Sequence, residues 1–107
     1  MIVKILANYA VDITKKSIYL PVLKTASENG YLDILQYLLD VGNVDINEVF
    51  SYGFTALMIA VKKDLLPVVQ FLIEHGANIY YKDNNNNTAL LLGVRYNRSQ
   101  IINYLVE

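Results

Sequence analysis

The side chains that could carry out acid–base or nucleophilic chemistry are few. His75 is the single histidine and the chain has no cysteine, so a His–Asp relay, a multi-histidine metal site or a cysteine zinc site cannot be assembled. Asp45 and Glu48 are spaced closely enough to act as a carboxylate pair, but they fall in a loop without a pocket. Glycines are too sparse for a phosphate-binding loop. We therefore expect no enzymatic activity, no metal and no cofactor.

Composition limits the classes of partner. Nine basic and ten acidic residues give a formal charge of -1, so no global attraction to nucleic acid or an anionic membrane is expected. The longest apolar stretches, such as 65–69 and 88–94, are far shorter than the roughly 20 residues that span a bilayer. With 54% apolar and 18% charged residues in 107, the chain should fold as one domain. Absence of cysteine is typical of a reducing compartment, and we expect a cytoplasmic protein.

Two motifs recur at a fixed distance, which indicates a repeat architecture. The segment 55–60, TALMIA, returns at 88–93 as TALLLG, and Asp45-Ile46 returns as Asn78-Ile79; both offsets are 33 residues (88 − 55 and 78 − 45). The apolar segments 33–39, 67–73 and 100–106 also align with one another residue for residue. Three aligned copies predict a stack of similar units.

Each unit has the pattern of two short helices. Leu57 and Ala60 lie three residues apart on one helical face, and Val68, Phe71 and Leu72 have the i, i+3, i+4 spacing of an amphipathic helix. These two apolar stripes are expected to pack against each other.

Proline and glycine mark the ends of the second helix. Pro67 suits the first helical turn, where a missing N–H costs nothing, and Gly76 and Gly42 follow the last apolar residue as stop signals. Beyond them, 45–47 and 78–80 have a β-like pattern and lead into turns that contain Gly53 or the asparagine run 84–87. We expect protruding, hairpin-like loops there.

These motifs resemble the ankyrin repeat family, in which T-P-L-H-x-A opens the first helix of a 33-residue unit. That motif stands here at 55–60 and 88–93 and more weakly at 21–26, and the downstream G-A-D-I-N element stands at 76–80 and, with one insertion, at 42–47. The resemblance implies an all-α solenoid of stacked helix-turn-helix pairs. It covers 1–107 as a single domain, with a degenerate half repeat at 1–20, full repeats at 21–54 and 55–87, and a truncated repeat at 88–107.

Some consensus side chains are missing. Ala56 and Ala89 replace the proline of the first-helix motif, Met58 and Leu91 replace its histidine, and Phe50 replaces the turn aspartate that Asp83 retains. Fewer hydrogen bonds between loops predict a looser array than a consensus design.

The resemblance implies a non-catalytic scaffold that binds another protein through the loop tips and the concave face of the first helices. The family's variable binding positions fall on residues of the loops and first helices: Val49, Ser51, Tyr52, Phe54, Lys62, Lys63, Lys82, Asn84, Asn85, Arg95 and Tyr96, together with Glu28, Asn29 and Asn87. The alternative is a regulatory or targeting segment of a larger protein, or a host-directed effector. Arrays of this composition resemble those of intracellular bacteria and large DNA viruses, which would place an effector in the host cytoplasm.

Loop aromatics point to the same region without reference to any family. Five aromatic residues lie in segments where a solenoid buries little, and they either anchor an interface or pack between adjacent loops: Phe50, Tyr52, Phe54, Tyr80 and Tyr81.

Charge is graded along the chain. Glu28 and Glu48 come early, whereas Lys62, Lys63 and Arg95, with Arg98 nearby, come late. This gradient reflects either an acidic partner or ordinary solvated charge.

Asn47 is a candidate for modification. Leu39 with 45–47 resembles the site at which asparaginyl hydroxylase modifies ankyrin repeats, which would make Asn47 the acceptor. The same residues are also ordinary repeat consensus.

Both ends of the array are apolar. The first helix carries Ile2, Val3, Ile5 and Leu6, and the last carries apolar residues within 101–106. Solenoids normally end in polar faces, so we expect further repeats or self-association at these ends.

Overall fold

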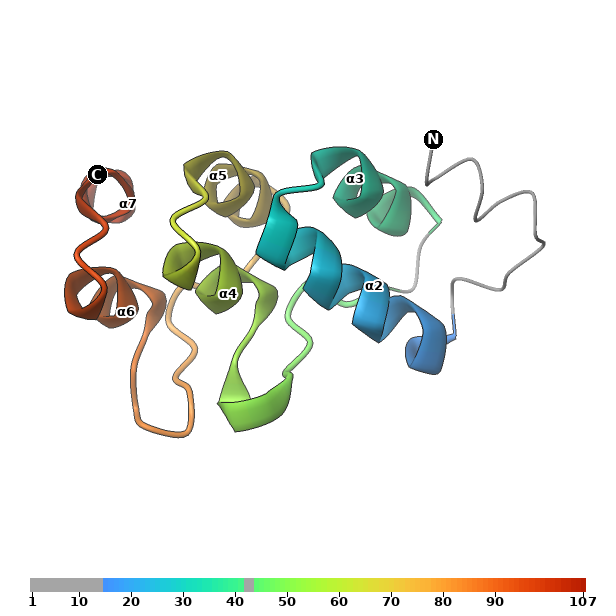
Figure 1. Ribbon diagram of the computed structural model, residues 1–107, viewed down its shortest axis with the longest axis horizontal. Coiled ribbons are helices and arrows are strands. Elements are labelled where there is room, and N and C mark those ends of the chain that lie inside the picture. Colours follow the sequence, from blue (N-terminus) through green and yellow to red (C-terminus); the bar gives the residue numbers. More distant parts are fainter. Residues whose placement is uncertain (1–14, 42–43) are drawn as a thin grey trace.

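The computed structural model describes residues 15–41 and 44–107 (Figure 1). Its helices are α2 (Lys16–Asn29), α3 (Leu32–Asp40), α4 (Ala56–Lys62), α5 (Leu66–Glu74), α6 (Ala89–Arg95) and α7 (Ser99–Val106), with the short 3-10 turn η1 (Ser51–Gly53). These described residues contain no strand. The predicted all-α class is confirmed.

The helices form two parallel rows. In Figure 1, α2, α4 and α6 lie side by side in one row, α3, α5 and α7 lie in the other, and the loops before α4 and α6 project beyond the first row. Each helix contacts its hairpin partner, and α4 contacts both α2 and α6 across the unit boundaries. The stacked helix-turn-helix arrangement is therefore the predicted solenoid.

Threonine caps begin the first helix of each later unit. The Thr55 Oγ1 accepts a hydrogen bond from the Met58 N–H at 3.4 Å, and the Thr88 Oγ1 accepts one from the Leu91 N–H at 3.3 Å. Each cap satisfies a backbone donor that the helix cannot pair internally. The recurrent threonine thus fixes where α4 and α6 start.

The other helix-end signals act as predicted where they can be observed. Pro67 lies in the first turn of α5, and Gly76 follows α5 with φ of +97°, a left-handed conformation that glycine adopts without strain. The Gly42 stop signal lies outside the described residues.

The prediction of β-like backbone at 45–47 and 78–80 is wrong. Residues 45–47 and 78–80 form turns, because side chains bond to their own backbone in place of a strand partner. The Asn47 N–H donates to the Asp45 Oδ1 at 2.8 Å, and the Tyr80 N–H donates to the Asn78 Oδ1 at 2.9 Å. The loops nevertheless protrude from the helical rows (Figure 1).

The boundary drawn between residues 20 and 21 falls inside a helix. α2 begins at Lys16 and runs through Pro21, whose ring is exposed and displaces no core residue. Tyr19, before this proline, is buried at 4% exposure and ties the first turns to the core. We therefore propose that the first described unit starts near Lys15; the half repeat assigned to 1–20 lies largely outside the described residues.

Burial differs sharply between equivalent residues of α4 and α6. Six consecutive residues of α4, from Ala56 to Val61, are at most 6% exposed. In α6 the residues 33 positions later include Leu90, Leu91 and Val94, which are 37%, 46% and 58% exposed. α4 lies between α2 and α6 in the first row, whereas α6 contacts α4 and its hairpin partner α7 but has only one first-row neighbour within the described chain.

This difference yields a matched test of the stack. Leu57→Ala should lower the free energy of unfolding by about 2–5 kcal/mol because a fully buried side chain leaves a cavity. Leu90→Ala, the same change one unit later, should cost about 1 kcal/mol because part of that side chain already contacts water. Urea unfolding followed by far-ultraviolet circular dichroism measures both. Equal losses would show that the two helices have equivalent environments and would contradict the arrangement.

Candidate interaction surface

A groove runs between the loops and the first-row helices. Its volume is about 470 Å³, within the range of about 300–1,000 Å³ found for ligand sites. It takes residues from α2, from the loop around η1, from the end of α4 and from the next loop: Lys24, Glu28, Phe50, Ser51, Tyr52, Phe54, Ile59, Lys62, Lys63 and Asn85.

About half of the expected binding positions line the groove. Six of them line it: Ser51, Tyr52, Phe54, Lys62, Lys63 and Asn85. Five others do not line it, although all are exposed: Val49, Lys82, Asn84, Arg95 and Tyr96. Glu28, also expected at the binding face, lines the groove, whereas Asn29 does not.

Sequence reasoning missed two lining residues. Lys24 lies one helical turn before Glu28 on α2, and that i, i+4 spacing could have identified it. Ile59 belongs to the first-helix motif and is only 6% exposed. It forms apolar wall rather than free surface, and no signal in the sequence separates it from the other buried residues of α4.

The loop tip at η1 is built on left-handed backbone. The Phe50 N–H donates to the Phe54 carbonyl at 2.6 Å, which closes the loop. Between them, Tyr52 and Gly53 have φ of +64° and +75°. This region suits glycine but is unusual for a bulky residue. Tyr52 is nevertheless held there with 80% of its surface exposed.

Neighbouring loop tips contact each other directly. The Asn84 N–H donates to the Tyr52 carbonyl at 3.1 Å. A Cβ atom on Gly53 would lie 2.5 Å from the Asn84 Oδ1 and 2.8 Å from its backbone nitrogen. Glycine is therefore required at 53 for both backbone conformation and packing, and the second loop braces the first.

Asp83 organises the second loop. Its Oδ1 accepts hydrogen bonds from the Asn85 and Asn87 N–H groups, both at 2.8 Å, and its Oδ2 accepts one from the Asn87 Nδ2 at 3.3 Å. Asn86 takes φ of +64°, as expected for a turn asparagine. The Arg95 Nε donates to the Asn87 Oδ1 at 2.8 Å. Arg95, one of the expected binding residues, thus supports the loop.

Burial raises the pKa of the Asp83 carboxyl, but the N–H groups of Asn87 and Asn85, with the positive charge of Arg95, outweigh it and hold the pKa below its ordinary value of 3.8. The folded protein thus favours the ionised form.

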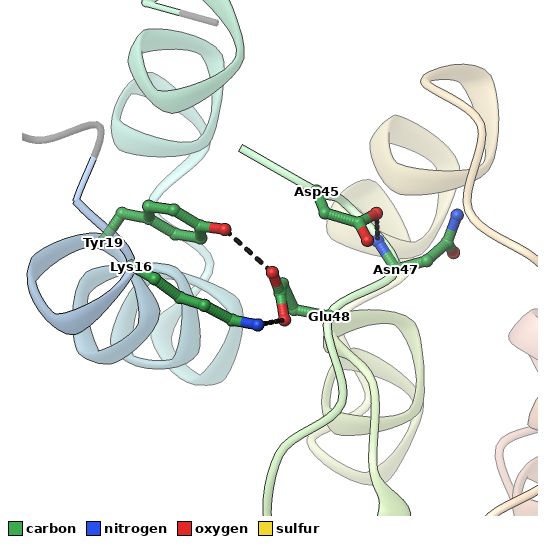
Figure 2. Close-up of polar contacts among 5 residues, drawn as sticks. All are labelled: Lys16, Tyr19, Asp45, Asn47 and Glu48. Atoms are coloured by element: carbon green, nitrogen blue, oxygen red, sulfur yellow. Dashed lines mark hydrogen bonds and ion pairs between the residues drawn. The ribbon is translucent and has the colours of Figure 1, made fainter. Parts of the chain in front are cut away.

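Glu48 has a structural role. Its Oε1 accepts a hydrogen bond from the Tyr19 hydroxyl at 2.8 Å, and its Oε2 lies 3.3 Å from the Lys16 Nζ (Figure 2). Burial, reinforced by the bond to Glu48, raises the pKa of the Tyr19 hydroxyl. Asp45 instead bonds to the Asn47 backbone (Figure 2). The two carboxylates therefore have separate structural partners.

Asn47 links consecutive units. Its Oδ1 accepts a hydrogen bond from the Asn78 N–H at 2.7 Å, and its Nδ2 donates to the Gly76 carbonyl at 3.2 Å. These contacts give the side chain a role in the repeat itself. Hydroxylation of Asn47 stays a prediction.

The late basic residues also divide by role. The Arg98 Nη2 donates to the Lys62 carbonyl at 2.6 Å, and its Nη1 lies 4.0 Å from the Asp64 carboxylate. Lys62 and Lys63 are exposed at the groove. The charge gradient of the sequence therefore includes Arg95 and Arg98, which make structural contacts, and lysines that face the groove.

The five loop aromatics include both exposed and packed side chains, as the two expected roles require. Tyr52 and Tyr80 are 80% and 79% exposed, whereas Phe50, Phe54 and Tyr81 are half-buried against the core. Among these five, only Tyr52 is both strongly exposed and part of the groove.

His75 packs at the end of α5. Its ring stacks on Phe71 with centroids 4.1 Å apart, and its Nδ1 lies 2.7 Å from the Phe71 carbonyl oxygen. Across residues 15–41 and 44–107, no group of three or more histidine, cysteine, aspartate or glutamate side chains is placed to hold a metal. In the same part of the chain, every helix is too short or too polar to cross a membrane.

The Asp83 network makes a pH-dependent prediction. Asp83→Asn should lower the free energy of unfolding by about 1–3 kcal/mol at neutral pH, because the new amide places a donor against the Asn87 amide. The pKa of Asp83 is lower in the folded protein than its ordinary value of 3.8. The carboxylate therefore stabilises the fold at pH values above 3.8, and this stabilisation is lost as the pH falls through the folded pKa. The difference between wild type and variant should therefore shrink in acid.

Urea unfolding between neutral pH and pH 3 measures this trend, with the exposed Glu74→Gln as a matched charge removal that should have little effect. A difference that stayed constant with pH would contradict the proposed charge on Asp83.

Comparison with known proteins agrees with this architecture. A family model described as ankyrin repeats in three copies matches residues 1–83 and 23–107. One chain of the solved Bd0816 predatory endopeptidase of Bdellovibrio bacteriovorus in complex with immunity protein Bd3460 superposes with a TM-score of 0.72 at 30% identity. That match covers 78% of this chain and 44% of the other.

Curated relatives show the same similarity. Alpha-latroinsectotoxin-Lt1a of Latrodectus tredecimguttatus is 35% identical over 77% of this chain and 6% of the toxin. Putative ankyrin repeat protein L675 of Acanthamoeba polyphaga mimivirus is 30% identical over 79% of this chain and 16% of its own length. The probable 26S proteasome regulatory subunit p28 of Saccharomyces cerevisiae is 39% identical over 57% and 27% respectively.

The chain thus spans between 6% and 27% of these three relatives. Its 33-residue period, paired helices and threonine caps agree with a family match that reaches from residue 1 to residue 107. The repeat, the fold and this family match together show that the chain belongs to the ankyrin repeat family.

Proposed function

We propose that this chain is a non-catalytic scaffold that binds a partner protein through the groove and its loop tips. The observation that carries the proposal is Tyr52, an aromatic side chain held 80% exposed at the edge of the groove. Exposed aromatic residues are the side chains that most often anchor protein interfaces, and repeat solenoids generally use such concave faces for binding.

Backbone strain at this residue supports the proposal. A left-handed φ of +64° at a tyrosine costs about 1–2 kcal/mol, and such strain persists only where surrounding contacts impose it. The hydrogen bond from Asn84 to the Tyr52 carbonyl and the close packing of Gly53 impose it here. A loop backbone held in place before binding loses less conformational entropy on association.

The chain's small share of its relatives supports a second reading, in which it is a regulatory or targeting segment of a larger protein or of a host-directed effector. The predatory endopeptidase structure is a complex with an immunity protein, which agrees with a binding role for this fold.

We place the protein in the cytoplasm, or in the host cytoplasm for an effector. The exposed residues outside the groove, Val49, Lys82, Asn84 and Tyr96, would extend the interface around it.

The sequence offers a matched pair for testing the groove. Tyr52 and Tyr80 are equally exposed, but only Tyr52 lines it. Partners captured by the wild-type chain are identified, and their affinities for both alanine variants are measured by calorimetry. Tyr52→Ala should weaken binding by about tenfold or more, as loss of an interface anchor does, while Tyr80→Ala should leave it unchanged.

Both variants should retain the wild-type unfolding midpoint, which separates binding from folding. Equal affinities of wild type and Tyr52→Ala for every captured partner would sink the proposed function.

A further inference from the structure

We infer that the groove binds an acidic segment of the partner that also carries a large apolar side chain. This inference rests on the proposed function of the groove and adds the chemistry of what it recognises.

Charge in the groove is opposite to that of the rest of the chain. Lys24, Lys62 and Lys63 line it with a single carboxylate, Glu28, so its formal charge is +2 (three minus one). The whole chain carries -1, which leaves -3 for all other residues (-1 minus +2). The groove therefore has a net positive charge while the rest of the chain is net negative, and a groove of one sign focuses attraction on ligands of the other.

The groove lysines are available to a ligand. Within residues 15–41 and 44–107, the ion pairs are those of Lys16 with Glu48 and Arg98 with Asp64, and neither involves Lys24, Lys62 or Lys63. Lys62 has its Nζ 5.9 Å from the centroid of the Phe54 ring, a contact with an aromatic face that leaves its N–H donors free for a carboxylate.

Apolar side chains accompany these cations. Phe50 and Phe54 are half-buried, Ile59 is 6% exposed, and all three line the groove. A wholly polar ligand would leave this surface without a partner, whereas an aliphatic or aromatic side chain would bury it. The volume of about 470 Å³ accommodates one large side chain together with flanking acidic residues.

A nucleic acid fits these features less well. Single strands stack bases on exposed aromatic residues and pair phosphates with lysines, both of which the groove offers. A phosphate backbone continues beyond the groove, however, and the rest of the chain has a net charge of -3, which does not favour an extended polyanion. The observations favour a short acidic peptide segment over a polyanion.

Binding of synthetic peptides to the full chain tests the inference. The probe is an extended peptide in which glutamates flank a central Phe-Leu pair. Three matched peptides replace the glutamates with glutamine, replace them with lysine, or replace the Phe-Leu pair with Gly-Ser. By fluorescence anisotropy at low salt, the glutamate peptide should bind about tenfold tighter than the glutamine peptide, and added salt should narrow that difference. Loss of the Phe-Leu pair should weaken binding by a similar factor.

Paired variants locate the effect. Lys62→Gln with Lys63→Gln should remove most of the preference for glutamate over glutamine. Lys63→Gln alone should remove part of that preference, whereas Lys15→Gln, an equal charge change at an exposed residue outside the groove, should preserve it. Unfolding midpoints of all these variants establish that the chains are folded.

The outcomes separate this inference from the proposed function. Equal binding of the glutamate and glutamine peptides, or absence of binding by the glutamate peptide, overturns the acidic ligand; captured partners that still depend on Tyr52 leave the scaffold function standing. Tighter binding of a single-stranded oligonucleotide than of the glutamate peptide overturns it in favour of nucleic acid. If the captured partners also bind the wild type and Tyr52→Ala equally, both proposals are contradicted.

Discussion

Packing of α4 between its neighbours is the contact on which the other features depend. Every residue from Ala56 to Val61 is buried, so this helix has no side that tolerates water along six consecutive positions. A helix that is apolar all round is stable only when other elements enclose it, and here α2, α5 and α6 do so. In a solenoid each unit is stabilised by such contacts with the next one. The apolar character of α4 therefore requires the stack, and the stack in turn determines where the loops emerge.

Polar contacts then fix how neighbouring loops are aligned. Asn47 receives the Asn78 N–H and donates to the Gly76 carbonyl, and the Asn84 N–H reaches the Tyr52 carbonyl. These bonds join residues of adjacent units, so one loop cannot shift along the stack without breaking them. Hydrogen bonds of this kind add modest net stability but strong geometric constraint. At position 50, where the turn aspartate is missing, the Phe50 ring packs against the core. That the array is looser than a consensus design stays a prediction.

The 33-residue period and the apolar stripes predicted the helix pairs, because helical spacing of buried residues is a local property of the chain. Thr55, Pro67 and Gly76 likewise act within a few residues of their own positions. The β-like reading of 45–47 failed because the Asp45 side chain pairs with the backbone two residues on, a choice that hydrophobic pattern does not reveal. The left-handed backbone at Tyr52 was equally hidden, since it results from contact with the following loop.

Equivalent residues in a repeat do not share an environment, and this limits how far a site can be read from a motif. Leu57 and Leu90 occupy the same motif position but are 1% and 37% exposed, because each is covered by whatever unit comes next. The groove follows the same logic: Lys24 comes from one unit, Lys62 and Lys63 come from another, and Asn85 comes from the loop beyond. No single unit contains the site. Any opening between α2 and α4 would separate the lysines that give the groove its charge, so the proposed binding requires the units to stay together.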